Sequence, residues 1–371
     1  MTRGVLFSSR FYIFIVILSI GCFIANASEG DNNPAFWYCL QECKFSGCVR
    51  VGLTKKSCVV EACHQYNKNV KMPLSLSLTK WSCEDDCKYH CMLATESARR
   101  SKPIKYYGKW PFHRVYGAQE IASVIFSLLN LLSHIICVLR LRRFYRKAVA
   151  AAASASTNSL SNAQLESAIP RNSSSLSIHA SLSARPNDAI RRWFLLSMIH
   201  LNAWVWSAVF HVRDVPLTER FDYLSAILVV FFSLYVALMR NLSRHRVYLR
   251  TLVQLSILCV FVTHLTYMLY VKFHYSWNVT VCVTVGIIQA AAWLHFCFRT
   301  RHPYRYRMLS FIVLLNAATM LELFDFPPIY NKLVDAHALW HAVTVPLTFL
   351  FYSFIQGDIS YILDQETRAS N

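Results

Sequence analysis

Two short strings in this chain combine nucleophilic and metal-binding side chains at helical spacing. WSAVFHVRD contains Ser207 and His211, DAHALWH contains His337 and His341, and Asp222 begins an apolar run soon after the first string. Residues four apart lie on one face of a helix, so each pair can act at a single point. Three imidazoles that leave one coordination position open form the ligand set of hydrolytic zinc sites. The residue types therefore predict a metal-dependent hydrolase with the three histidines as ligands.

Oxygen-bearing side chains beside these histidines can complete the chemistry. A bound Zn²⁺ ion lowers the pKa of its water ligand to about 7, and a neighbouring carboxylate can then relay the proton. Asp222 is the expected base or proton shuttle because it starts a helix and is well fixed, and Asp214 in the adjacent loop is the second candidate. We expect Ser207 to donate a hydrogen bond to the water or to the reacting carbonyl.

Histidine spacing is weak evidence when taken alone. The chain has 14 histidines, so chance yields roughly half an H-x3-H pair per chain, which is too often to identify a metal site. His134, His200, His264 and His295 also fall in apolar runs, and we expect them to be packed or hydrogen-bonded. The candidate ligands differ from these because the predicted topology brings them to one membrane depth.

The composition indicates a membrane protein. Of the 371 residues, 55% are hydrophobic, 14% are aromatic and only 16% are charged, and the apolar residues gather into long blocks. A span needs roughly 17 to 25 mostly apolar residues. Seven blocks qualify, near 118–139, 193–212, 222–240, 251–272, 278–298, 308–325 and 336–356. The predicted fold class is therefore an all-α membrane protein, a seven-helix transmembrane bundle.

The distribution of the net charge of +18 predicts the orientation of the spans. Lys and Arg gather in short connectors such as LRLRRFYRK, RNLSRHRVYLR and RTRHPYRYR, which argues against a nucleic-acid partner. These connectors share one side if the segment before the first span is luminal, and basic loops stay in the cytosol. The second span then runs outward, whereas the third and seventh run inward. All five candidate residues are thereby predicted at the luminal end.

The amino-terminal residues agree with this orientation. Residues 1–27 have a basic start, a short apolar stretch and a small-residue pattern at Ala25 and Ala27, as in a cleaved secretory signal. A permanent anchor helix is the alternative reading of this stretch.

Eight cysteines crowd into the polar segment that follows, and an even number in an exported segment indicates disulfides. The sequence does not choose among the many possible pairings. A zinc module is the alternative, because Cys83, Cys87 and Cys91 share one helical face.

These signals divide the chain into four parts. A signal peptide (1–27) precedes a luminal cysteine-rich segment (28–117), the seven-helix hydrolase domain (118–356) and a cytosolic tail (357–371). Within the hydrolase domain, residues 148–188 are rich in Ser, Ala and Asn without apolar periodicity, which predicts a disordered cytosolic loop.

Two features near the luminal mouth have open roles. The cysteine-rich segment either stabilises the structure or helps to recognise glycan or protein. Glu120, at the start of the first span, either supports the site or borders the lipid headgroups.

Longer strings resemble those of one hydrolase family. Seven spans with Ser207-x3-His211, Asp222 and His337-x3-His341 resemble the superfamily of alkaline ceramidases and adiponectin-type receptors. The strings WSCEDDCKYHCM, KYYGKWPFHRVYGAQE, LNAWVWSAVFHVRD, ERFDY and DAHALWHAVTVP resemble its phospholipase-type branch, the post-GPI-attachment-to-proteins factors. The resemblance extends from the cysteine-rich segment to the last span, and the long Ser/Ala-rich connector departs from it.

The resemblance implies remodelling of GPI-anchor lipids in the secretory pathway. A phospholipase A2-type reaction would hydrolyse the sn-2 acyl ester of GPI-anchored proteins in the luminal leaflet and leave a lyso-form for reacylation. It implies a multi-pass protein of the Golgi or endoplasmic reticulum membrane with a luminal amino-terminal segment. The implied partners are GPI-anchored proteins and membrane lipids.

Two other functions fit part of the pattern. A ceramidase-like amidase uses the same constellation, so the five residues do not separate amide from ester substrates. A non-enzymatic seven-span receptor also combines a cysteine-rich segment with seven helices, but it has no need for three histidines at one end. The sequence also leaves the metal open, since three nitrogen ligands accept several divalent ions, and it does not choose between Golgi and endoplasmic reticulum.

Overall fold

The chain is described by a computed structural model over residues 28–50, 57–58, 60–66, 71–99, 101–166, 188–242 and 247–370. Across these residues the regular structure is helical, and extended pairing is limited to isolated bridges. Seven of the described helices are long and apolar enough to cross a membrane, as the sequence predicted. The predicted signal peptide lies outside the described residues.

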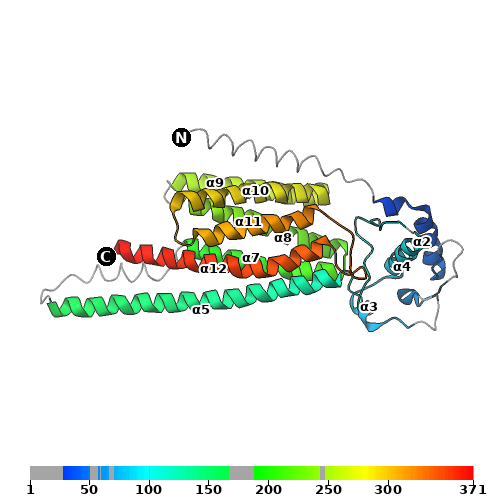
Figure 1. Cartoon of the computed structure of the whole chain (residues 1–371), viewed down its shortest axis with the longest axis horizontal. Helices are drawn as coiled ribbons and strands as arrows, with labels where there is room; N and C mark the ends of the chain where they lie inside the picture. Colours follow the sequence, from blue (N-terminus) through cyan, green and yellow to red (C-terminus); the bar gives the residue numbers. More distant parts are fainter. Residues whose placement is uncertain are drawn as a thin grey trace.

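The seven long helices run side by side along the longest axis of the molecule (Figure 1). They are α5 (Ile121–Glu166), α7 (Asp188–Val212), α8 (Pro216–Asn241), α9 (Val247–Thr266) with the π-helical turn η3 (Tyr267–Val271), α10 (Tyr275–Thr300), α11 (Arg305–Leu323) and α12 (Ala336–Ser370). The cysteine-rich segment, with α2 (Pro34–Ser46), α3 (Leu74–Leu78) and α4 (Cys83–Ala98), lies at one end of this bundle (Figure 1). We call it the capped end, and the carboxyl terminus lies toward the opposite end.

The prediction of disorder across residues 148–188 is wrong for its first part, because α5 continues to Glu166. The connector opens with the string AVAAAASAS, and alanine has the strongest helix propensity. The preceding span supplies a formed helix, so extension does not need a new nucleus. Residues 167–187 lie outside the described part of the chain. At the other terminus, α12 runs on through most of the predicted tail to Ser370.

Disulfides hold the cysteine-rich segment together, as the sequence predicted, and the structure supplies their pairing. Two disulfides, Cys39–Cys91 and Cys43–Cys87, join helix α2 (Pro34–Ser46) to α4 (Cys83–Ala98). Each helix contributes cysteines four apart, so the antiparallel pair is fastened on one face. Two further bonds join Cys63 to Cys83 and Cys48 to Cys58.

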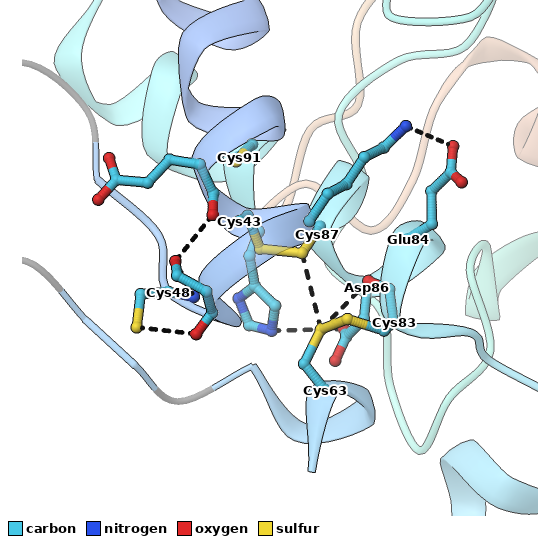
Figure 2. Close-up of a disulfide and its surroundings, with 12 residues drawn as sticks. Cys43, Cys48, Cys63, Cys83, Glu84, Asp86, Cys87 and Cys91 are labelled. Carbon is cyan, nitrogen blue, oxygen red and sulfur yellow. Dashed lines mark hydrogen bonds and ion pairs between the residues drawn. A yellow bond between two sulfur atoms is a disulfide. The ribbon is translucent and has the colours of Figure 1, made fainter. Parts of the chain in front are cut away.

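The zinc alternative for this segment is therefore wrong. Figure 2 shows the Cys43–Cys87 and Cys63–Cys83 bridges next to one another, with the Sγ atoms of Cys63 and Cys87 3.7 Å apart. Each sulfur is already bonded to a second sulfur and offers no thiolate to a metal. Cys91 is likewise bonded, to Cys39.

Packing inside the bundle brings three helices together at the capped end. Helix α5 packs against both α7 and α12, and α7 packs against α8. A large apolar cluster holds these helices together nearer the opposite end, centred on Trp193, which is fully buried and stacks on Trp293. Apolar side chains thus fill that half, while polar side chains from α7 and α12 gather at the capped end.

The starts of two helices fix the positions of candidate residues. Asp335 precedes α12, and its Oδ1 accepts a hydrogen bond from the backbone nitrogen of Ala338 at 2.8 Å, as an N-cap does. His337 and His341 follow in the first two turns. Pro216 opens α8, a position where the missing N–H costs nothing. The expectation that Asp222 starts this helix is therefore wrong, because Asp222 lies in its second turn.

Candidate metal centre

Three imidazoles from two helices meet at the capped end of the bundle. The Nε2 atom of His211, in the last turn of α7, lies 3.2 Å from Nε2 of His341 and 3.3 Å from Nε2 of His337, both on α12. The remaining pair, His337 and His341, is separated by 2.9 Å at the same atoms. One nitrogen of each ring therefore points at a common centre, although the residues lie up to 130 positions apart in the chain.

The spacing of these nitrogens fits a divalent ion such as zinc. Zinc–nitrogen bonds of about 2.0–2.1 Å in tetrahedral geometry place ligand nitrogens about 3.3–3.4 Å apart, close to the 2.9–3.3 Å found here. Two of the rings turn Nδ1 to a carboxylate, so their protons lie there and Nε2 carries a lone pair. A cation at the common centre would relieve the repulsion between these lone pairs.

Carboxylates orient two of the three rings. The Oε2 atom of Glu120 lies 2.6 Å from Nδ1 of His211, and Oε2 of Glu322 lies 2.6 Å from Nδ1 of His337. Carboxylates in this position fix the tautomer and raise the basicity of histidines that bind metals. Glu120 is held in turn, because its backbone nitrogen donates to the carbonyl oxygen of His211 at 3.1 Å.

A lysine from the segment before α5 completes this arrangement. The Nζ atom of Lys109 lies 2.7 Å from Oε1 of Glu120 and 2.9 Å from Oδ2 of Asp214. Burial favours the neutral forms of Lys109 and Glu120, but their attraction outweighs it. The pKa of Lys109 is raised by Glu120 and Asp214, and the pKa of Glu120 is lowered by Lys109 and His211. Glu120 is therefore a carboxylate that can accept the Nδ1 proton of His211.

The third ring is fixed by its backbone and by aromatic neighbours. The side-chain nitrogen of Asn130 on α5 donates to the carbonyl oxygen of His341 at 2.8 Å. The ring of Trp204 meets that of His341 edge to face, with centroids 5.3 Å apart. Within the described residues, Nδ1 of His341 is buried without a hydrogen-bond partner. Packing rather than a carboxylate thus sets the angle of this imidazole.

The other predicted residues lie around the three histidines. Ser207 is buried one turn before His211 on α7, and its Oγ lies 3.0 Å from Oγ of Ser127. Asp222 is partly buried and makes no hydrogen bond to the described part of the chain. Asp214, the second candidate base, is instead paired with Lys109. The arrangement favours Asp222 over Asp214 as a free carboxylate.

Sequence reasoning missed two supporting residues and left a third open. Glu322 and Lys109 were not singled out, and Glu120 had two alternative roles, of which the contact with His211 favours support of the site. A signal for Glu322 exists in the sequence, because it is an acid near the end of a span predicted to finish at the same depth. Lys109 lies outside the spans and carries no such signal.

The candidate metal centre is most accessible from outside the bundle on the side of His337. Its side chain is 33% exposed, whereas those of His211 and His341 are almost fully buried. An ion held there could exchange a water molecule or a substrate on the His337 side, as hydrolytic metal sites require.

The chain matches one protein family over most of its length. The model of the Per1-like family matches residues 73–359, which begin just before α3 and include every candidate residue. The chain is 37% identical to "Post-GPI attachment to proteins factor 3" of Drosophila melanogaster, with 94% of this chain and 95% of that protein covered.

Two vertebrate relatives carry the name "GPI-specific phospholipase A2-like PGAP3". The Danio rerio protein is 33% identical over 92% of this chain and 94% of its own length, and the Homo sapiens protein is 30% identical over 95% of each. No solved structure matches the chain.

Proposed function

The chain belongs to the Per1-like family, and from this membership and its three convergent histidines we propose that it remodels GPI-anchor lipids. The proposed reaction is hydrolysis of the sn-2 acyl ester of GPI-anchored proteins, a phospholipase A2-type step. The names of the relatives support the substrate class, since they refer to GPI attachment and to a GPI-specific phospholipase A2-like protein. Partners of the site are then GPI-anchored proteins and the surrounding membrane lipids.

The observation that carries the reaction type is the meeting of three Nε2 atoms within 3.3 Å of one another. His211, His337 and His341 would hold one divalent ion, and zinc suits their number and spacing. When bound, the ion acts as a Lewis acid and lowers the pKa of a coordinated water molecule. A seven-span receptor has no need for such a centre.

The chain's own residues supply the remaining chemistry. Glu120 and Glu322 hold the His211 and His337 rings in the tautomer that presents Nε2. Asp222, free of other hydrogen bonds within the described chain, takes the proton that leaves the attacking water and passes it to the departing alcohol. Ser207 donates a hydrogen bond toward the ester oxygen as negative charge develops there.

The proposed depth of the site agrees with the position of the ester. Glu120 lies immediately before the first residue of α5, and the three histidines lie within the outermost turns of their spans. Lipid esters lie just below the headgroups, at the same depth. Disulfides in the cysteine-rich segment favour an oxidising compartment, so we place the capped end in the lumen of the Golgi or endoplasmic reticulum.

A lipid measurement in cells that lack the protein tests this function. Wild-type chain, His337→Ala and a matched control, His295→Ala, are expressed, and the acyl chains of GPI anchors are analysed by mass spectrometry. His295 is an exposed histidine of α10, away from the centre. We expect the original sn-2 chain to be removed in cells with wild type or His295→Ala, and to stay in place with His337→Ala at equal expression.

Other results identify the competing functions. Full remodelling by His337→Ala would refute the assignment of the centre. Ceramide that accumulates in the deficient cells, with GPI anchors unchanged, would support a ceramidase-like amidase instead. Absence of tightly bound metal in the purified protein would favour the alternative function of a non-enzymatic seven-span receptor.

A further inference from the structure

A cavity of about 200 Å³ opens beside the metal centre, between the cysteine-rich segment and the bundle. Helix α4 forms one wall, the segment before α5 forms another, and the loop between α7 and α8 closes it with Arg213 and Asp214. The volume is below the roughly 300–1,000 Å³ of sites for drug-sized ligands. It suits one ring with its substituents rather than a whole oligosaccharide.

Aromatic rings and charges of both signs share the lining. Trp110 and Tyr107 are aromatic side chains that are not fully buried, and rings of this kind pack against the C–H faces of sugars and of inositol. Lys88 and Arg213 supply positive charge, and Asp214 supplies negative charge. Each of these charges already has a partner. Asp214 pairs with Lys109, Arg213 pairs with Asp85, and Lys88 pairs with Glu84. An anionic group of a ligand would be an additional partner for the two cations.

Arg213 has one hydrogen-bond donor without a partner in the described residues. Arg213 is 9% exposed, and its guanidinium donates to Oδ2 of Asp85 at 2.7 Å and to the carbonyl oxygen of Asp214 at 3.2 Å. Its buried Nε–H has no partner within the described residues. A buried donor without a partner costs about 1–3 kcal/mol, and an anionic ligand would remove that cost.

The cavity shares a wall with the metal centre. Glu120 and Lys109 line it, and Glu120 also holds His211 through its second carboxylate oxygen. In a GPI lipid, the phosphate and the sn-2 ester are attached to neighbouring carbons of one glycerol unit. A phosphate in the cavity therefore leaves the ester within reach of the histidines.

We propose that this cavity binds the inositol phosphate part of the GPI head while the ester is cleaved. The inference rests on the proposed function and names the part of the substrate that the chain recognises. The phosphate faces Arg213 and Lys88, the inositol ring packs against the aromatic side chains, and the glucosamine lies outside the cavity. A lipid without an inositol phosphate lacks these contacts, so the cavity selects inositol phospholipids, GPI among them, over the other phospholipids of the leaflet.

Direct binding to the full-length chain in detergent tests the proposal without relying on activity. The probe is water-soluble glucosaminyl-inositol phosphate, measured by isothermal calorimetry with inorganic phosphate and free inositol as comparisons. Wild type and His341→Ala are both expected to bind the probe saturably, because His341 does not line the cavity. This outcome in His341→Ala separates head recognition from hydrolysis.

Two variants remove single features of the cavity. Arg213→Lys keeps a cation near Asp85 but deletes the unpartnered Nε–H, and Tyr107→Ala deletes an exposed ring. Each is expected to weaken binding at least tenfold. Tyr38→Ala, an exposed tyrosine of α2 that does not line the cavity, is the matched control and is expected to bind normally.

Three results would overturn the proposal. They are no binding by wild type, unchanged binding by both cavity variants, or binding of inorganic phosphate as tight as that of the full probe. Normal GPI hydrolysis without probe binding would refute the cavity alone. Probe binding without GPI hydrolysis would refute the proposed reaction and leave recognition of the head in place.

Discussion

The carboxylate of Glu120 lies 2.6 Å from Nδ1 of His211, and this contact turns Nε2 of the same ring toward His337 and His341. A residue just outside the membrane span thereby sets the direction of a ligand inside it. Glu120 is itself held by Lys109, which belongs to the segment that joins the cysteine-rich residues to the bundle. The capped end and the centre are consequently one connected structure.

The contact between Glu120 and His211 is tested by a substitution that removes the charge of the Glu120 side chain and keeps its size. Glu120→Gln should weaken divalent-metal binding by roughly 10–100-fold, the usual cost of losing a carboxylate behind a histidine ligand. Glu322→Gln should act similarly through His337. Competition with a chromogenic chelator gives both affinities.

The matched control for these two variants is Glu219→Gln, an acid in the first turn of α8 that does not contact the histidines. It should bind metal as wild type does. Unchanged affinity in both Glu120→Gln and Glu322→Gln would contradict the supporting role of the two carboxylates.

Asp222 should affect turnover without affecting metal content. Asp222→Asn keeps the side-chain volume but cannot take a proton, and loss of a general base costs typically about 10²–10⁴-fold in rate. The measurement is the rate of GPI-lipid hydrolysis by purified protein beside its metal-to-chain ratio. Asp214→Asn is the comparison, and it should lose less activity because Asp214 is paired with Lys109. The reverse order would make Asp214 the base.

The disulfides should differ in their contribution to stability according to the loops they close. Cys43–Cys87 spans a sequence separation of 44, and Cys48–Cys58 spans 10. A native disulfide contributes about 2–5 kcal/mol to the free energy of unfolding. In the chain-entropy model, the bond that closes the longer loop contributes about 1 kcal/mol more than the other. Paired Cys→Ser replacements, compared by thermal unfolding in detergent, should therefore lower the melting temperature more at Cys43 and Cys87. Equal shifts would argue against the entropic account.

A buried charge pair at the opposite end should be costly to break. Arg240 on α8 pairs with the fully buried Asp358 on α12, whose second oxygen accepts from Nε1 of Trp193 at 2.7 Å. His302 also pairs with Asp358, with Nε2 3.2 Å from Oδ1. Arg240→Met removes the guanidinium partner of the buried carboxylate and should cost about 3–5 kcal/mol. Adding Asp358→Leu to that variant should restore part of the loss. If the double variant is less stable than Arg240→Met alone, the buried charge of Asp358 is not the cause of the lost stability.

Most of the fold was predictable because its signals are local. Seven apolar runs and the eight cysteines can be read directly from the sequence, and the structure confirms the spans and the disulfides. The pairing of Cys39 with Cys91 was not predictable, since it depends on how α2 and α4 face one another. The continuation of α5 past residue 148 was missed because polar, serine-rich composition was weighed above alanine's helix propensity.

The candidate site was predictable only as far as helical spacing and membrane depth extend. Residues four apart identified His337 with His341 and Ser207 with His211, and matching span ends brought the pairs together. Neither signal reports the lateral packing that places Glu322 behind His337, or the ion pair of Lys109 with Glu120. Those contacts come from the tertiary arrangement, so the structure was needed to find them.

The central claim, that His211, His337 and His341 hold one divalent ion, is tested most directly by the metal content of the purified full-length chain. Inductively coupled plasma mass spectrometry should find about one zinc or similar ion per wild-type chain. It should find a small fraction of that in His341→Ala and a normal content in His295→Ala. An equal metal content in His341→Ala and wild type, or no bound metal in either, would contradict the account.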